Sequence, residues 1–169
     1  GDRPLVYKLN LGPGRRPLFL IGPYKTQCGG CDAITGYQDV LPPLLAKYAA
    51  LGHVFFEGLL ISGGYGSVGR ALGDLRDAGY RVVFALLDTP LETCLERITA
   101  RRAARGVTEP LNPVNTEQKH KAAHNSQKKI AEEYGHECVS VPHRQAVRTV
   151  LGLFGLMLNK EPRFARAQS

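Results

Sequence analysis

The chain has 169 residues, of which 43% are hydrophobic, and this is enough for one well-buried domain but short for two. Its formal net charge of +7 favours anionic partners such as nucleotides or nucleic acid. We see neither a membrane-spanning run nor a secretory signal, so we expect an intracellular protein with no membrane partner.

The first third predicts a hairpin, a loop and a helix. Two β-prone runs, Leu5–Leu11 and Pro17–Ile21, flank the turn sequence Gly-Pro-Gly-Arg. A polar, glycine-bearing loop over 22–36 follows the second run. Apolar residues at helical spacing then predict a helix over 37–51.

The middle third predicts two strands that each lead toward a helix. Residues 54–61 form an apolar strand interrupted by Glu57-Gly58, and a short helix is expected over 67–78. The apolar run Val82–Leu87 has the length of a strand covered on both faces in a parallel sheet. Thr89 is expected to cap the next helix, with Glu92 completing a capping box.

That next helix carries a basic face. Arg97, Arg101 and Arg105 recur every four residues, with Arg102 beside them, and the helix follows the carboxyl end of a strand, where α/β folds keep their ligands. We interpret the face as an anion-binding site. The alternative is a solvated helix face paired with acids such as Glu96.

The last third continues the alternation. A loop over 107–114 leads into a long polar helix that Asn115 or Thr116 caps and that reaches about Tyr134. A short strand over 138–141 and an amphipathic helix over 144–154 follow, and residues 160–169 read as a loose tail. The alternation predicts one α/β domain over 1–159, with a parallel sheet, helices on both faces, an N-terminal hairpin and a helical lid over about 97–128.

Two acidic residues are candidates for chemistry. Glu57 is ionisable within an otherwise apolar strand, and the glycine after it allows a ligand to approach closely. The competing interpretation is a structural acid paired with an arginine. Asp32 either accepts the proton of a substrate hydroxyl or caps the following turn.

Asp32 ends a loop that combines an aromatic ring, a cation and a tight turn. Tyr24 and Lys25 are candidate substrate-binding residues, and Gly29-Gly30 indicates a backbone turning close to a ligand. The same glycines separate Cys28 from Cys31, a pair that a zinc or redox site also uses. No second cysteine pair or spaced histidine pair lies nearby in the sequence.

The segment 64–71 has the glycine spacing of a Walker A loop between a strand and a helix. Arg70 and Ala71 replace the lysine and the Ser or Thr that this motif needs, and alanine has no oxygen to offer Mg²⁺. We therefore interpret the segment as a flexible loop and not as a nucleotide-binding loop.

The order of these pieces resembles P-loop kinases of the nucleoside and nucleotide kinase group. The resemblance rests on Ile-Gly-Pro-Tyr at 21–24, Phe-Phe-Glu-Gly at 55–58 and Leu-Leu-Asp-Thr-Pro at 86–90, which is followed by the arginine helix. It covers about residues 18–154. More narrowly, Cys28-Gly-Gly-Cys31-Asp32 together with Glu57 resembles phage 5-hydroxymethyluracil DNA kinases.

The resemblance implies a three-layer P-loop-kinase sheet and transfer of phosphate from ATP to a hydroxyl, with DNA as a possible acceptor. It implies that Glu57 holds Mg²⁺ through water, that Asp32 acts on the acceptor, and that the arginines at 97, 101, 102 and 105 bind phosphate. The family's Walker A segment should precede the hairpin, and we expect it upstream of Gly1. The alternatives are a non-catalytic nucleic-acid-binding module and a kinase of a free nucleoside, nucleotide or small metabolite.

Overall fold

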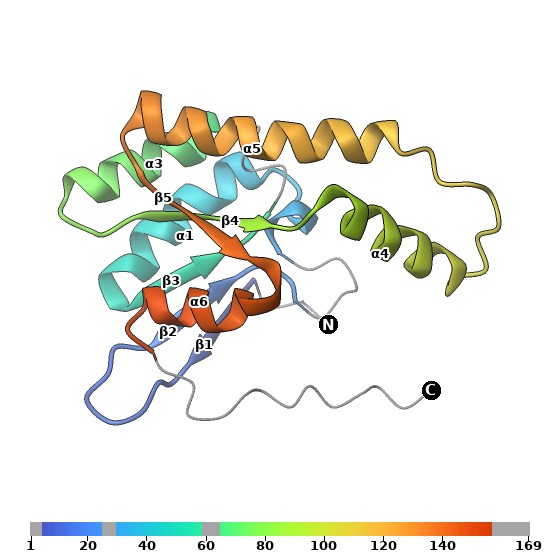
Figure 1. Ribbon diagram of the computed structural model, residues 1–169. Helices are drawn as coiled ribbons and strands as arrows, with labels where there is room; N and C mark the ends of the chain where they lie inside the picture. Colours follow the sequence, from blue (N-terminus) through green and yellow to red (C-terminus); the bar gives the residue numbers. More distant parts are fainter. Residues whose placement is uncertain (1–4, 25–29, 59–64, 157–169) are drawn as a thin grey trace.

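The computed structural model describes residues 5–24, 30–58 and 65–156 (Figure 1). The predicted tail from residue 160 lies outside these ranges. Strands and helices alternate after an N-terminal hairpin, and single 3₁₀ turns, η1 and η2, precede two of the helices. The elements are β1 (Val6–Leu9), β2 (Leu18–Ile21), η1 (Cys31–Ala33), α1 (Tyr37–Leu51), β3 (His53–Phe56), α3 (Tyr65–Asp77), β4 (Val83–Asp88), α4 (Leu91–Ala103), α5 (Val114–Tyr134), β5 (Glu137–Pro142), η2 (His143–Gln145) and α6 (Ala146–Leu153).

The strands form two small sheets. In the first, β1 is antiparallel to β2, which confirms the hairpin, and β2 is parallel to β3. In the second, β4 is parallel to β5. The α/β class is confirmed, but within the described residues no strand ladder joins β3 to β4, so the single parallel sheet expected from the sequence is not observed.

The divided sheet changes the surroundings of β4. Its residues were expected to be covered on both faces, and this expectation is wrong: none of them is fully buried, and Leu87 is 51% exposed. The physical reason is that β4 has one strand neighbour, β5, so the edge away from β5 is unpaired among the described residues.

The main core lies between the first sheet and the helices α1 and α3. The two helices pack against each other, and α1 contacts β3. Pro42 lies inside α1 and has no N–H to donate to the carbonyl of Gln38, four residues earlier. The hydroxyl of Ser67 on α3 donates to that carbonyl at 2.7 Å, so the carbonyl that Pro42 leaves without a donor links the two helices. The buried core residues are Ile21, Cys31, Ile34, Leu41, Leu45, Val68 and Leu72.

Helix α3 corrects the interpretation of the Walker-like segment. Residues 65–71 are helical and form the first two turns of α3, so they are not a flexible loop. Val68 is fully buried in the core, and this burial favours the helix despite the glycines on either side.

Two predicted helix caps are also wrong. Helix α4 begins at Leu91, its N-cap is Pro90, and no side chain caps it. Thr89 instead lies in a tight turn, where its N–H donates to the carbonyl of Leu87 at 3.0 Å. Helix α5 begins at Val114, so Asn115 and Thr116 lie inside the helix and do not cap it. The N–H of Val114 donates to the side-chain oxygen of Asn112 at 3.1 Å.

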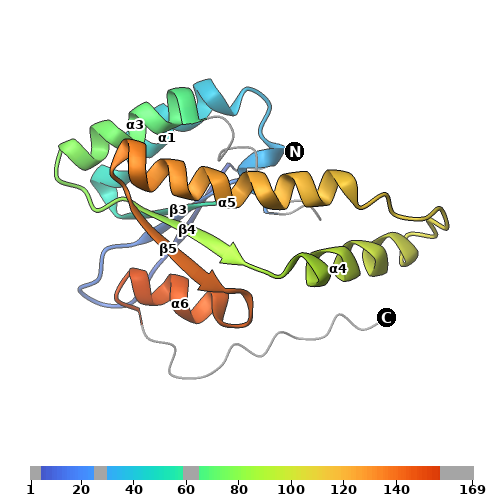
Figure 2. The same cartoon turned by 45° about the horizontal axis from the view of Figure 1, so that its top comes forward.

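Helices α4 and α5 form an arm that extends past the end of β4, as both views show (Figures 1 and 2). The C-terminal half of α5 lies along β4 and β5, and α6 lies on the opposite side of these strands. None of the helices in the described ranges has the length and apolar character needed to cross a bilayer.

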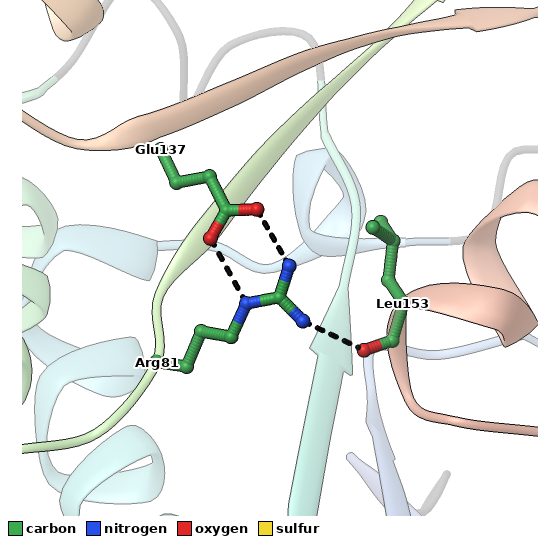
Figure 3. A network of polar contacts seen from close by, with 3 residues as sticks. All are labelled: Arg81, Glu137 and Leu153. Atoms are coloured by element: carbon green, nitrogen blue, oxygen red, sulfur yellow. Dashed lines mark hydrogen bonds and ion pairs between the residues drawn. The ribbon is translucent and has the colours of Figure 1, made fainter.

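The base of the second sheet is tied together by Arg81 (Figure 3). Its guanidinium donates two hydrogen bonds to the carboxylate of Glu137, at 2.6 and 2.9 Å, and a third to the carbonyl of Leu153 at 3.3 Å. One side chain thus joins the start of β4, the start of β5 and the end of α6. The bond to Arg81 lowers the pKa of Glu137.

We expect Arg81→Ala to lower the melting temperature slightly at neutral pH, because exposed ion pairs contribute little even with two-pronged geometry. The folded pKa of Glu137 is depressed, so its contribution is present above the ordinary glutamate pKa and is lost as pH falls through the folded value. The difference in melting temperature between Arg81→Ala and wild type should therefore become smaller at acidic pH. Thermal melts between neutral and acidic pH measure it, and a constant difference would contradict the assignment.

Candidate functional site

The loop after β2 is held against the end of β3. The backbone N–H of Cys31 donates to the carbonyl of Glu57 at 2.7 Å. A Cβ on Gly30 would lie 3.0 Å from both the Cγ and the carbonyl oxygen of Glu57, and one on Gly22 would lie 2.9 Å from the backbone of Gly30. Both glycines have positive φ, 81° and 137°. The backbone can therefore approach this closely only because these residues lack side chains.

Glu57 lies just beyond the last residue of β3 and is exposed. The expectation that it is buried within a strand is wrong, because the strand ends at Phe56. The structural alternative is not observed either, since no ion pair in the described part of the chain includes Glu57. An exposed carboxylate at the carboxyl end of a parallel strand is placed where α/β folds bind ligands.

Asp32 and Tyr24 lie on the same loop. Asp32 is an exposed residue of the turn η1, and the N-cap positions of η1 and α1 belong to Gly30 and Gly36, so Asp32 fills neither. The phenol of Tyr24 donates to the carbonyl of Ile21 at 3.4 Å. Partial burial raises the pKa of Tyr24, and the negative charge of Glu57 raises it further. The Tyr24 phenol is thus a neutral donor near the Glu57 carboxylate.

Cys31 is part of the core. Cys31 is fully buried, and its thiol donates a hydrogen bond to the carbonyl of Ile21 at 3.5 Å. Burial, the largest cause, raises the pKa of Cys31 to about 12. A thiol that stays protonated is a poor nucleophile and a poor metal ligand, which opposes both the zinc and the redox interpretation of this cysteine. Cys28, Lys25 and Gly29 lie outside the described residues.

The four arginines lie on the arm. Arg97, Arg101 and Arg105 are exposed, and Arg102 donates to the carbonyl of Glu109 at 3.2 Å. Helix α4 starts three residues after β4 ends, at the same side of the fold as the end of β3 (Figure 1). In the described structure no ion pair joins Glu57 to these arginines, so their convergence on one ligand stays a prediction.

Two histidines that the sequence analysis did not single out fasten α5 and η2 to the turn after β4. His120 on α5 is hydrogen-bonded to the carbonyl of Thr89 at 2.9 Å, and His143 in η2 approaches the carbonyl of Asp88 at 3.4 Å. Both fasten distant segments to the turn between β4 and α4. Neither residue type nor spacing in the sequence signals these contacts, because each depends on the path of the chain.

A separate hollow of about 350 Å³ lies between α3 and the end of α5. Gly66, Gly69 and Gly73 leave it unfilled, and Arg70 and Arg76 border it. None of the predicted site residues lines it. We therefore place the candidate site at the ends of β2 and β3 and not in this hollow.

Comparison with known proteins gives one informative match. The chain is 40% identical over 129 residues to the 5-hmdU DNA kinase of Pseudomonas phage PaMx11. The chain is a relative of this phage enzyme. This confirms the narrower resemblance, to phage 5-hydroxymethyluracil DNA kinases. The alignment covers 76% of the chain and 66% of the phage protein, which is just under two thirds of that protein. No protein-family model matches the chain, and no solved structure matches it significantly.

The contact between Gly30 and Glu57 is testable with a matched pair of variants. Gly30 has φ 81° and ψ −175°, a region that is almost closed to other residues, and its Cβ would meet Glu57. We expect Gly30→Ala to destabilise the fold by roughly 1–3 kcal/mol. Gly36→Ala should cost about 1 kcal/mol, because Gly36 also has positive φ but faces open space. Denaturant unfolding measures both, and equal losses would argue against the contact.

The buried thiol gives a chemical test. Because burial raises its pKa to about 12, Cys31 should resist iodoacetamide at pH 8 in the folded protein and react once the protein is unfolded. Mass spectrometry of the alkylated peptides distinguishes Cys31 from the half-buried Cys94. Rapid alkylation of Cys31 in the native state would restore the redox and metal interpretations.

Proposed function

We propose that this protein contributes to the ATP-dependent phosphorylation of a hydroxyl group in DNA, with the hydroxymethyl group of 5-hydroxymethyluracil as the acceptor. The observation that carries the proposal is the placement of Glu57 and Asp32 on touching segments at the ends of β2 and β3. The name of the phage relative supports a kinase acting on DNA.

The donor set fits Mg²⁺ bound together with ATP. This ion usually takes one or two carboxylates, with water and substrate phosphates completing its shell. The described residues hold no cluster of three or more His, Cys, Asp or Glu. Glu57 would hold the ion through water, and the bound ion would neutralise charge on the transferred phosphate.

The chain's own residues then have distinct tasks. Asp32 accepts the proton of the acceptor hydroxyl, as its exposed carboxylate allows. The phenol oxygen of Tyr24, whose one O–H is donated to Ile21, accepts a hydrogen bond from the acceptor. Gly30 belongs with Lys25 and Gly29 to the predicted substrate-binding residues of the same loop. Arg97, Arg101, Arg102 and Arg105 stabilise negative charge on the phosphates.

Among the described residues, β3 and β4 each have an edge without a strand partner, and a P-loop kinase architecture would place a strand there. A further parallel strand between them would join the two sheets into one and cover apolar side chains such as Leu87, which β4 now exposes. We infer that the strand leading into the nucleotide loop takes this place. Hydrogen exchange on the natural gene product tests the inference, since amides on both edges of β3 and β4 should be protected. Rapid exchange along the β3 and β4 edges would contradict it.

The decisive experiment replaces the carboxylate of Glu57. In the gene product, Glu57→Gln should lower transfer of labelled γ-phosphate to hydroxymethylated DNA by roughly 100-fold or more, because charge stabilisation dominates this chemistry. The backbone bond from Cys31 uses the Glu57 carbonyl, so the fold should persist. Glu132→Gln on α5 is the matched control and should leave transfer unchanged. Wild-type turnover by Glu57→Gln would reject the assignment.

The same assay separates the other functions. A non-catalytic nucleic-acid-binding module is favoured by the charge of +7 and would bind DNA without consuming ATP. A kinase of free nucleosides, nucleotides or small metabolites would phosphorylate hydroxymethyldeoxyuridine in preference to the hydroxymethylated duplex.

A further inference from the structure

The basic charge of the chain is concentrated on the arm. Seven of the 22 Lys and Arg residues, but only two of the 15 Asp and Glu residues, lie between positions 97 and 128. This stretch, which we call the arm tip, therefore carries five of the seven net positive charges. It comprises the C-terminal half of α4, the connection, and most of α5.

The arm tip stands away from the core. Helix α4 contains no fully buried residue, and α5 contains one, Ile130, which lies beyond the tip. Both views show α4 and the N-terminal part of α5 projecting past the strands (Figures 1 and 2). Several of the partly buried residues of α5, among them Thr116, His120, Ala123 and Gln127, repeat at helical spacing and define its inner face, whereas its lysines are exposed.

The positive charge is least compensated toward the free end. Lys128 and Lys129 pair with Glu132 and Glu133 one turn further along α5, at 3.9 and 3.7 Å. Lys119 and Lys121, nearer the free end, form no ion pair with any described residue. Two exposed, unpaired lysines on a projecting helix are available for a polyanion.

We propose that the arm tip docks the phosphate backbone of the DNA acceptor, with Lys119 and Lys121 as contacts. This rests on the proposed function, which supplies DNA as the partner, and it assigns to α5 a task distinct from that of the α4 arginines. Neutralising DNA phosphates with lysines releases condensed counterions, so the contacts strengthen binding and make it depend on salt. Docking on the arm positions a long acceptor whose target base reaches the loop near Asp32.

A binding assay without ATP tests the proposal. The titration follows fluorescence anisotropy of a labelled hydroxymethylated duplex with wild type and with the double variant Lys119→Gln/Lys121→Gln, at several salt concentrations. We expect the variant to bind about tenfold more weakly or worse near 0.1 M salt, and the slope of log affinity against log salt to fall by about 1.8, or 0.9 for each lost contact.

The matched control removes the same net charge elsewhere. Lys8→Gln/Arg15→Gln lies on the exposed N-terminal hairpin, far from the arm in Figure 1, and should change the affinity and the salt slope little. Equal losses for both double variants, or none for the arm variant, would overturn the proposal. Unchanged circular dichroism and melting temperature would show that the substituted side chains do not affect folding.

Failure of the docking proposal is distinguishable from failure of the kinase proposal. At a concentration of hydroxymethylated duplex that saturates both proteins, the backbone contact no longer limits the reaction, so the arm variant should transfer phosphate at the wild-type rate. A lower rate at saturation in the arm variant would mean that these lysines act at the reaction centre, and would contradict a docking role.

Discussion

The candidate site depends on one backbone contact, the hydrogen bond from the N–H of Cys31 to the carbonyl of Glu57. It fastens the loop after β2 to the end of β3, and it forms only because Gly30 allows the backbone to come within van der Waals distance of Glu57. The bond uses main-chain atoms, so the carboxylates of Asp32 and Glu57 stay exposed. Burial of the Cys31 side chain in the core anchors the loop from the other side. The backbone contact at Cys31 thus places the exposed side chains of Asp32 and Glu57 on touching segments, as the proposed function requires.

The molecule divides into a body that holds this contact and an arm that carries the charge. His120 and Gln127, on the inner face of α5, bind this helix to the carbonyls of Thr89 and Val139, which fastens the arm to the body while its lysines stay in solvent. The two parts start from the same edge of the fold, because β3 and β4 both end there (Figure 1). Under the proposed function, a ligand bound at that edge would have Asp32 and Glu57 on one side and the basic helices on another, an arrangement suited to bringing a phosphate donor and a polyanionic acceptor together.

Much of the local structure could be predicted. Periodicity alone predicted the helix over 37–51 with the bounds that α1 has, and turn residues located the hairpin. The caps of α4 and α5 were missed, because Thr89 and Asn115 have the right side chains but sit where the tertiary path places a tight turn or an interior helical residue. The predicted start of helix α3, at residue 67, was two residues too late, since the burial of Val68 outweighs the cost of the neighbouring glycines.

By itself, the sequence predicted candidate residues for chemistry and most of the helices and strands, because spacing, proline and glycine act over a few residues. The tertiary structure alone decided that Gly30 touches Glu57, that Glu57 is exposed and unpaired among the described residues, and that β3 and β4 do not pair. Such relations join residues far apart in the chain. They follow from how helices and strands pack, and periodicity contains no information about that.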